Sequence, residues 1–201
     1  MDFANSKAEQ VNMWLDALDA AFSRLNQDLL RDIEAVSVSA QQHGSVYWRR
    51  GASQTLEVLE CNSGLRECLV DSFAINDCPI WADSSTSVFC EYLEEAMGGP
   101  DELARLTGSA AYERFTGPQI ARIILQCHSE WMACERISLV SSFASSLLLQ
   151  SYAPIDAADA SGMNLMDLRN RVWLPTACAC VAGSATCDLI RSRLMFFSFR
   201  C

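Results

Sequence analysis

The stretch Ala35–Trp48, whose sequence is AVSVSAQQHGSVYW, decides the fold prediction. From Ile33 to Ala40 the residues alternate in polarity and include several β-branched side chains, which predicts a strand. We expect the strand to end at Gln41–Gly44, and Val46–Trp48 then resumes an extended pattern. Extended segments on both sides of a polar turn indicate that the chain contains a β-sheet.

His43 lies in this turn and is one of only two histidines in the chain. Ligands of open α/β sheets bind beyond the carboxyl ends of strands, so a histidine there can hydrogen-bond a small polar ligand. Gly44 would let the chain turn sharply or let the ligand approach the backbone. A histidine that only satisfies the turn is an equally good interpretation.

Helices are predicted on both sides of this stretch. Apolar residues recur at helical spacing from Ala8 to about Leu30, which predicts one amphipathic helix. Further along the chain, capping residues and an N-terminal proline mark helix starts. We expect helices from Asp83, from Pro100 and from Gly117, a buried helix over 135–151, a loop over 152–163 and a short helix over 164–173. The run Ile137–Val140 alone would also suit a strand.

Composition restricts the classes of partner. A chain of 201 residues that is 50% hydrophobic and 20% charged can bury the core of one domain. Its net charge of −10 disfavours nucleic acid. The N-terminus has no signal-peptide pattern, and the longest apolar stretches are too short to span a bilayer. We therefore expect a soluble cytoplasmic protein with no membrane partner; the sequence leaves its oligomeric state open.

The ten cysteines are unevenly placed, and four of them lie among the last 24 residues. Without a secretory signal or a regular spacing, reduced thiols are the better interpretation. From Leu174 onward three arginines stand against a single aspartate, unlike the acidic remainder of the chain. We predict that residues 174–201 are a divergent, non-native tail, an alternative or out-of-frame ending and not a folded element.

Two further segments carry candidate binding residues. Arg114 lies in Ala111–Gly117, and its guanidinium offers five N–H donors that suit sugar hydroxyls or phosphoryl charge. A surface ion pair is the alternative. Asp83 could offer a carboxylate to sugar hydroxyls beside the ring of Trp81, although the N-cap of the next helix fits it better.

No motif predicts a metal or a nucleotide site. Cys127-His128 and Cys134 lack the paired spacing of a zinc site. The two carboxylates of Asp156–Gly162 have no fixed geometry, so a turn is favoured there. The chain has neither a glycine-rich phosphate-binding motif nor a G-x-S-x-G elbow.

Several of these segments, taken together, resemble animal xylulose kinases, which belong to the FGGY group of carbohydrate kinases. The segments are AVSVSAQQHGSVYW (35–48), DCPIWADSST (77–86), TGSAAYERFTGPQIARI (107–123), ERISLVSSFA (135–144) and SYAPIDAADASGMNLMDL (151–168). The match runs, with gaps, from about Met13 to Trp173.

This resemblance implies a fold and an activity. Family members have two actin/hexokinase-like (ribonuclease H-like) α/β domains, and the first binds the sugar while the second binds ATP. They transfer the ATP γ-phosphate, with Mg²⁺, to the 5-hydroxyl of D-xylulose. Residues 1–173 would then be an incomplete N-terminal sugar-binding domain. His43 and Arg114 are similar to sugar-contacting residues, and Trp81 and Asp83 fall in a segment that lines the same cleft.

The chain also departs from the family. The family's initial hairpin with its phosphate loop is echoed only by Met1–Phe3. The family's catalytic aspartate lies beyond the point that matches Trp173, so we expect no catalytic residue and no ATP or Mg²⁺ site here. The expected fold is a three-layer α/β domain without its first hairpin, truncated at both ends and inactive alone. The alternative function is a non-catalytic isoform that binds a sugar or a partner weakly.

Overall fold

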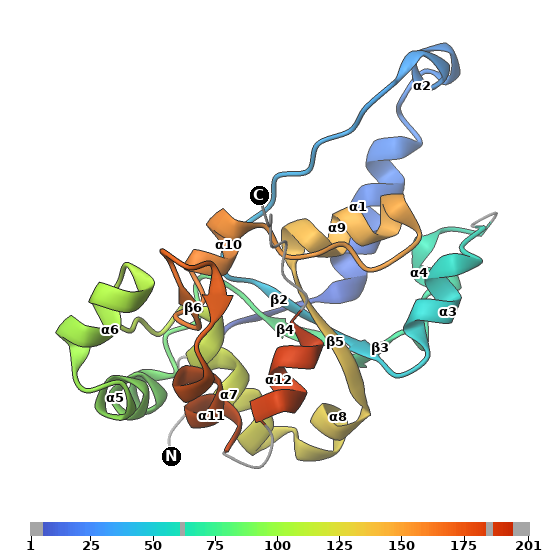
Figure 1. The fold of residues 1–201 in the computed structure, drawn as a ribbon. Coiled ribbons are helices and arrows are strands. Elements are labelled where there is room, and N and C mark those ends of the chain that lie inside the picture. Colours follow the sequence, from blue (N-terminus) through green and yellow to red (C-terminus); the bar gives the residue numbers. More distant parts are fainter. Residues whose placement is uncertain (1–5, 61–62, 184–186, 195–201) are drawn as a thin grey trace.

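The computed structural model describes residues 6–60, 63–183 and 187–194 (Figure 1). Its centre is a three-stranded antiparallel sheet of β2 (Ser45–Arg49), β3 (Phe73–Ile75) and β5 (Cys134–Leu139), in the order β3-β2-β5. Tyr47 of β2 lies opposite Ile75 on one side and Ile137 on the other. The extended pattern predicted for Val46–Trp48 is thus confirmed, as the middle strand of the sheet.

Two short antiparallel pairs flank this sheet. The first joins β1 (Ala8–Gln10) to β4 (Asp77–Pro79), and the second joins β6 (Met166–Asp167) to β7 (Val172–Trp173).

Helices cover both faces of the sheet. Alternate residues of β2 point to opposite faces, so Val46 and Trp48 join one apolar cluster while Tyr47 joins the other. Helices on the Trp48 side are α1 (Val11–Phe22), α3 (Ala52–Glu57), α4 (Leu65–Cys68) and α9 (Val140–Leu149). Helices on the Tyr47 side are α5 (Ser87–Ala96), α6 (Pro100–Thr107), α7 (Thr116–Gln126), α8 (His128–Ala133), α11 (Pro175–Ala182) and α12 (Cys187–Arg193). The result is the expected three-layer α/β arrangement (Figure 1).

The predicted starts of three helices agree with the structure to within a few residues. α6 begins with Pro100 in its first turn and ends where Gly108 adopts a φ of 90°, a left-handed conformation that glycine takes without strain. α5 and α7 begin at Ser87 and Thr116.

The strand predicted at Ile33–Ala40 is absent, and this part of the prediction was wrong. The segment connects α2 (Gln27–Asp32) to the turn at His43 as an extended chain, and Val36 is 62% exposed. Within the described residues, its main chain from Glu34 to Gln41 makes no hydrogen bond to another main-chain group. An alternating pattern favours a strand only where a neighbouring strand completes the ladder.

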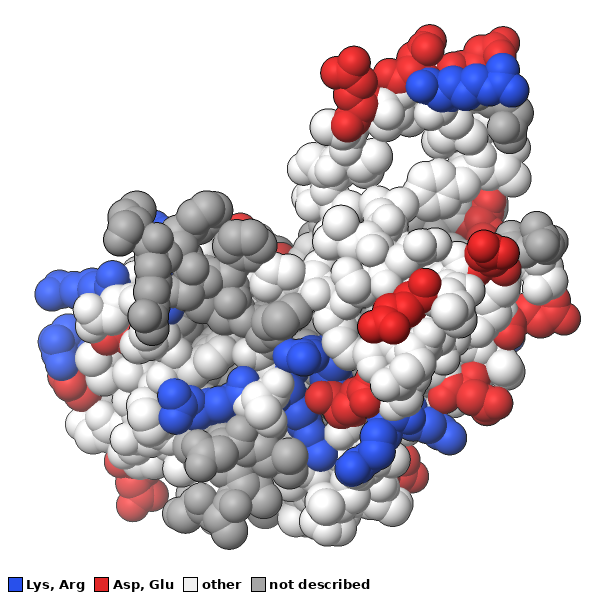
Figure 2. Space-filling model, turned by 45° about the vertical axis from the view of Figure 1, so that its right-hand side comes forward, with Lys and Arg blue, Asp and Glu red and all other residues white. Residues whose placement is uncertain are grey.

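α2 itself projects beyond the body of the molecule, with a hollow beneath the extended segment that follows it (Figure 2). Its tip carries an exposed ion pair in which Arg31 and Asp28 are 3.5 Å apart.

Two other stretches differ from the prediction. Residues 135–151 are not one helix, because β5 occupies their first part and α9 the rest. Residues 164–173 form the β6–β7 hairpin and not a helix, because the Asp167 carboxylate accepts hydrogen bonds from the amides of Arg169 and Asn170 and closes a turn. The predicted loop over 152–163 contains one short helix, α10 (Ala157–Ser161).

The prediction that the tail from Leu174 is not a folded element was also wrong for its described part. Ala177 and Cys178 of α11 and Ile190 of α12 are fully buried in the Tyr47-side cluster. Arg193 donates a hydrogen bond to the carbonyl of Trp131 at 2.9 Å and lies 4.0 Å above its ring. An alanine-rich run that opens with a proline is a good short helix, and its apolar side chains find a place in the core. Residues 184–186 and 195–201 lie outside the described part, and the non-native origin of the tail stays a prediction.

None of the helices in the described ranges is both long enough and apolar enough to cross a membrane.

Candidate functional site

His43 occupies a tight and well-anchored turn between the extended segment and β2. Its φ is 67°, and its carbonyl accepts a hydrogen bond from the Thr116 hydroxyl at 3.1 Å. The amide of Gly44 bonds back to the carbonyl of Gln42 at 2.8 Å. A Cβ on Gly44 would lie 2.9 Å from Val140 Cγ2, so the glycine allows the turn to pack against the start of α9. The sequence suggested a sharp turn or a close ligand as the reason for Gly44, and the structure adds a third, because packing against Val140 leaves little room for a Cβ.

Arg114 lies in the segment that leads into α7. Gly117, in the first turn of that helix, donates a hydrogen bond to the carbonyl of Met163 at 3.0 Å. A Cβ on Gly117 would lie only 2.5 Å from that oxygen. The close contact holds the YERFTG segment against the chain that follows α10.

These two anchors bring His43 and Arg114 to one short row of side chains. The guanidinium of Arg114 lies 4.5 Å from the ring centre of Tyr112, and the ring of Tyr112 is 6.0 Å from that of Phe115. The imidazole of His43 follows at 4.9 Å from Phe115. Hence two residues that are far apart in the sequence, both proposed for sugar contact, share one aromatic support, which we call the His43–Arg114 row.

The electrostatics of this row keep the imidazole neutral at pH 7. Burial lowers the pKa of His43 below its ordinary value of 6.5, and the positive charge of Arg114 lowers it further. A hydrogen bond to the main chain of Gly162 and the charge of Asp159 oppose this shift. A neutral imidazole has one donor and one acceptor nitrogen, whereas the guanidinium only donates. The row can therefore recognise groups that both donate and accept, such as hydroxyls.

A small polar cavity lies near the row. It has a volume of about 290 Å³ between the extended segment, the start of α9 and α10, and its polar lining includes Ser39, Gln42, Ser141, Asp156 and Asp159. The Ser141 hydroxyl donates a hydrogen bond to the Asp159 carboxylate.

Sequence reasoning considered the two aspartates only as a weak cation site, and it did not find Ser141. Within the described residues, no group of three or more His, Cys, Asp or Glu side chains could hold a metal ion.

The structure does not bring Asp83 to the row. Asp83 is 2% exposed, and its Oδ2 lies 2.8 Å from a nitrogen of the equally buried Arg122. Its Oδ1 accepts hydrogen bonds from both the amide and the hydroxyl of Ser85. Thr86, not Asp83, occupies the N-cap of α5. Both carboxylate oxygens thus have protein partners. Trp81 is 52% exposed, on the surface beside this pair.

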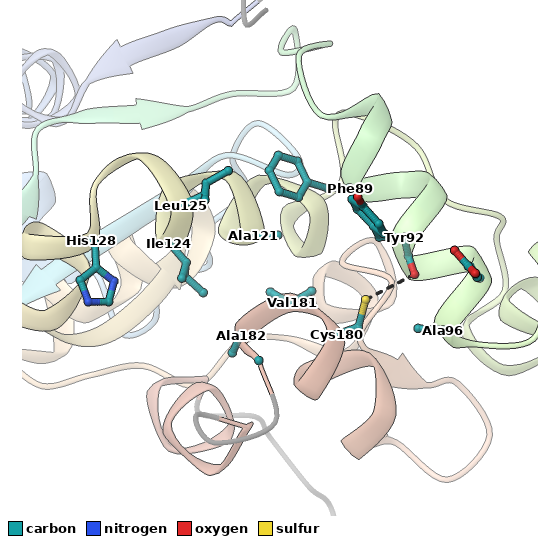
Figure 3. Close-up of a pocket in the computed structure, with 12 residues that line it drawn as sticks. Phe89, Tyr92, Ala96, Ala121, Ile124, Leu125, His128, Cys180, Val181 and Ala182 are labelled. Atoms are coloured by element: carbon teal, nitrogen blue, oxygen red, sulfur yellow. Dashed lines mark hydrogen bonds between the residues drawn. The ribbon is translucent and has the colours of Figure 1, made fainter. Parts of the chain in front are cut away.

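A larger cavity lies elsewhere and has a different chemistry. It has a volume of about 810 Å³ between α5, α7 and α11, and mainly apolar side chains line it, including Phe89, Ile124 and Val181 (Figure 3). Cys180 also lines this cavity, and its thiol donates a hydrogen bond to the carbonyl of Tyr92 at 3.5 Å. Burial raises the pKa of that thiol, which disfavours a thiolate nucleophile. None of the predicted site residues lines this cavity.

Comparison with known proteins identifies relatives of this chain. No family model matches it. Xylulose kinase 2 of Arabidopsis thaliana is 49% identical to it over 168 residues, which are 82% of this chain and 30% of the plant protein. The chain is homologous to the xylulose kinases. The mouse xylulose kinase gives a similar result, with 48% identity over 165 residues. The chain thus spans about 30% of the length of the curated xylulose kinases that it matches.

Solved structures confirm the predicted fold class, a part of the actin/hexokinase-like fold of sugar kinases. The kinase from Brucella ovis, described as a xyloylose kinase, superposes with a TM-score of 0.71 at 15% identity, covering 96% of this chain and 34% of that one. A gluconate kinase from Lactobacillus acidophilus gives a TM-score of 0.67 at 13% identity, covering 98% and 35%. At these identities the likeness concerns the fold alone.

Proposed function

We propose that this chain carries a sugar-binding part of a xylulose kinase, with residues 1–173 as its sugar-binding domain. The whole protein would transfer the γ-phosphate of ATP, with Mg²⁺, to the 5-hydroxyl of D-xylulose and release D-xylulose 5-phosphate. The observation that carries the proposal is the convergence of His43 and Arg114 on one aromatic row. Homology to proteins named xylulose kinase supplies the reaction.

The chemistry of the row suits an uncharged polyhydroxy ligand. Arg114 donates hydrogen bonds to ligand oxygens, and neutral His43 both donates and accepts. The rings of Tyr112 and Phe115 give an apolar floor for the carbon skeleton of a sugar. Asp83 and Trp81 have weaker support, because the Asp83 carboxylate is engaged by Arg122 and Ser85.

We assign no residue of this chain to ATP or Mg²⁺. The cavity of about 810 Å³ is lined mainly by apolar side chains, whereas nucleotide phosphates need cations or main-chain amides. We also assign no general base. Every step proposed for these residues is therefore one of binding and orientation.

A second candidate function is a sugar-binding module that does not turn over ATP. The His43–Arg114 row favours it, because the row offers groups that bind a ligand and no assigned general base. The two candidates differ in one measurement, which is the release of ADP in the presence of ATP, Mg²⁺ and D-xylulose.

Calorimetric titration of the full chain with D-xylulose tests the proposal. We expect saturable heat from the unchanged chain and a dissociation constant at least about tenfold weaker for His43→Ala and for Arg114→Ala, equivalent to about 1.4 kcal/mol. The matched control is His128→Ala, which changes the other histidine, in the apolar cavity.

D-gluconate and glycerol serve as competing ligands, because a gluconate kinase and a glycerol kinase are among the structural neighbours. A chain that circular dichroism shows to be folded, yet that gives no saturable heat with D-xylulose, would contradict the proposal. Tighter binding of gluconate or glycerol would assign the row to a different sugar or polyol.

A further inference from the structure

Gly162 contacts the imidazole of His43 from the C-terminal end of α10. A Cβ built on Gly162 would lie 2.9 Å from His43 Cε1 and 3.1 Å from Nδ1, both closer than ordinary van der Waals contact. The φ of Gly162 is −79°, which any residue adopts. The backbone conformation therefore does not require glycine at this position, whereas the packed imidazole does.

Phe115 is a second neighbour of the same imidazole. The Phe115 ring lies 4.9 Å away at an interplanar angle of 56°, and the main chain of His43 is held by the Thr116 hydroxyl. The ring thus contacts one aromatic side chain and lies against one glycine, and a hydrogen bond to the main chain of Gly162 opposes the lowering of its pKa.

We propose that Gly162 is a positioning residue that sets the tautomer of His43. Its carbonyl accepts a hydrogen bond from Nδ1–H, the nitrogen that lies nearer to Gly162, and this leaves Nε2 without a proton. Nε2 is then a fixed acceptor for a ligand hydroxyl. A hydrogen bond on one ring nitrogen decides which nitrogen carries the proton in neutral histidines generally. The role of Nε2 toward a sugar rests on the proposed function, whereas the tautomer itself does not.

The arrangement has a consequence for ligand selection. Arg114 offers only donors and Nε2 only an acceptor, so a matching ligand must accept at one point and donate at another. Hydroxyl groups do both. An anionic group would satisfy Arg114 but would leave Nε2 without a donor. Among the described residues, the charges that act on the pKa of the ring are that of Arg114, which precedes α7 and lowers it, and that of Asp159 in α10, which raises it. Protonation of the imidazole at acid pH removes the acceptor and adds a charge near Arg114.

Nitrogen NMR of histidine-labelled full chain tests this inference directly. Only His43 and His128 give imidazole signals, and the His128→Ala variant assigns them. At pH above 6.5 we expect His43 to be neutral with the proton on Nδ1. Finding the proton on Nε2, or an equal mixture of both tautomers, would overturn the proposal without any variant.

Two variants test the role of Gly162 in a folded protein. Gly162→Ala should displace the ring, shift His43 toward a mixture of tautomers and weaken binding of D-xylulose about tenfold or more. The control is Ser161→Ala in the same helical turn, whose hydroxyl donates a hydrogen bond to the carbonyl of Ala158. Phe115→Leu removes the aromatic contact of the imidazole and should weaken binding while keeping the proton on Nδ1.

The outcomes distinguish the positioning of His43 by Gly162 from the binding of a sugar by the row. A Gly162→Ala chain that keeps both the tautomer and the affinity would show that Gly162 does not position His43. The expected tautomer together with no heat from D-xylulose in the unchanged chain would retain the positioning role and refute the sugar assignment.

Discussion

The buried ion pair between Asp83 and Arg122 gives the sharpest test of the structure. Both side chains are almost fully buried, at 0% and 4% exposure, and they approach to 2.8 Å. Replacing Asp83 by asparagine keeps its size and an acceptor for the amide of Ser85, but it leaves the Arg122 charge buried without its counter-ion. Removal of one partner of a buried pair costs about 3–5 kcal/mol.

That cost is large compared with the whole stability of a domain, which is about 5–15 kcal/mol. With a urea dependence of about 2 kcal/mol per molar, the unfolding midpoint should fall by roughly 1.5–2.5 M. Urea titration followed by circular dichroism measures this shift. The control is Asp28→Asn, whose pair with Arg31 is exposed and should contribute less than about 1 kcal/mol.

Two results would refute the reasoning. The first is an Asp83→Asn midpoint that moves no more than that of Asp28→Asn. The second is an Asp83→Leu, Arg122→Met double variant that is as unstable as the two single changes added together, because a coupled pair should show a favourable interaction term. A folded Asp83→Asn chain that loses D-xylulose binding would restore the sugar-contacting role that the sequence suggested.

Three further predictions concern other parts of the molecule. Gly117→Ala should destabilise the chain by about 1–3 kcal/mol in urea, because its Cβ would meet the carbonyl of Met163. Ile190→Ala should cost about 2–5 kcal/mol if the tail packs as described, measured in the same way. Burial raises the pKa of Glu135, but hydrogen bonds from Tyr152 and two main-chain amides outweigh it and hold this pKa below 4.5. Its contribution to stability should therefore be present above pH 4.5 and be lost as the pH falls through the lower, folded value, and Glu135→Gln should remove that pH dependence.

Each of these predictions has an outcome that contradicts it. Val172 is exposed and serves as the comparison. If Ile190→Ala were no less stable than Val172→Ala, the tail would not be packed in the core, as its composition had suggested. A stable Gly117→Ala chain would place the YERFTG segment further from Met163. A stability difference between the chain and Glu135→Gln that does not shrink in acid would show that the carboxylate has no favourable partners.

Local signals in the sequence predicted the local features. The proline and acids that open α6 gave its true start, because capping chemistry is decided within a few residues. Asp167 was misjudged, although its turn is equally local, because the apolar residues around it also fit a helix. The strand at Ile33–Ala40 failed because a strand depends on neighbours that its own sequence does not contain.

In the candidate site, too, the residues that depend on distant packing could not be predicted. His43 and Arg114 were identified by resemblance, and the structure places them in one row. Phe115 and Gly162 were not singled out, because their contact with the imidazole exists only once α7 and α10 are packed. Asp83 was considered as a sugar contact or as an N-cap, and its ion pair was not foreseen because Arg122 lies on a helix whose position the sequence does not reveal.

The open segment before His43 has a thermodynamic consequence. Within the described residues, its main-chain amides from Glu34 to Gln41 have no main-chain partner, so they should exchange hydrogen at rates close to those of an unfolded peptide, while those of β2 are protected. The residues from Ala35 to Gln42 carry neither a charge nor a proline to discourage the approach of another strand. A strand that paired with this segment would form a β-ladder with it and would reduce the conformational entropy of the chain that leads into the His43 turn. The ligand would then meet an ordered turn and would no longer bear that ordering cost, so strand pairing and ligand binding would strengthen each other.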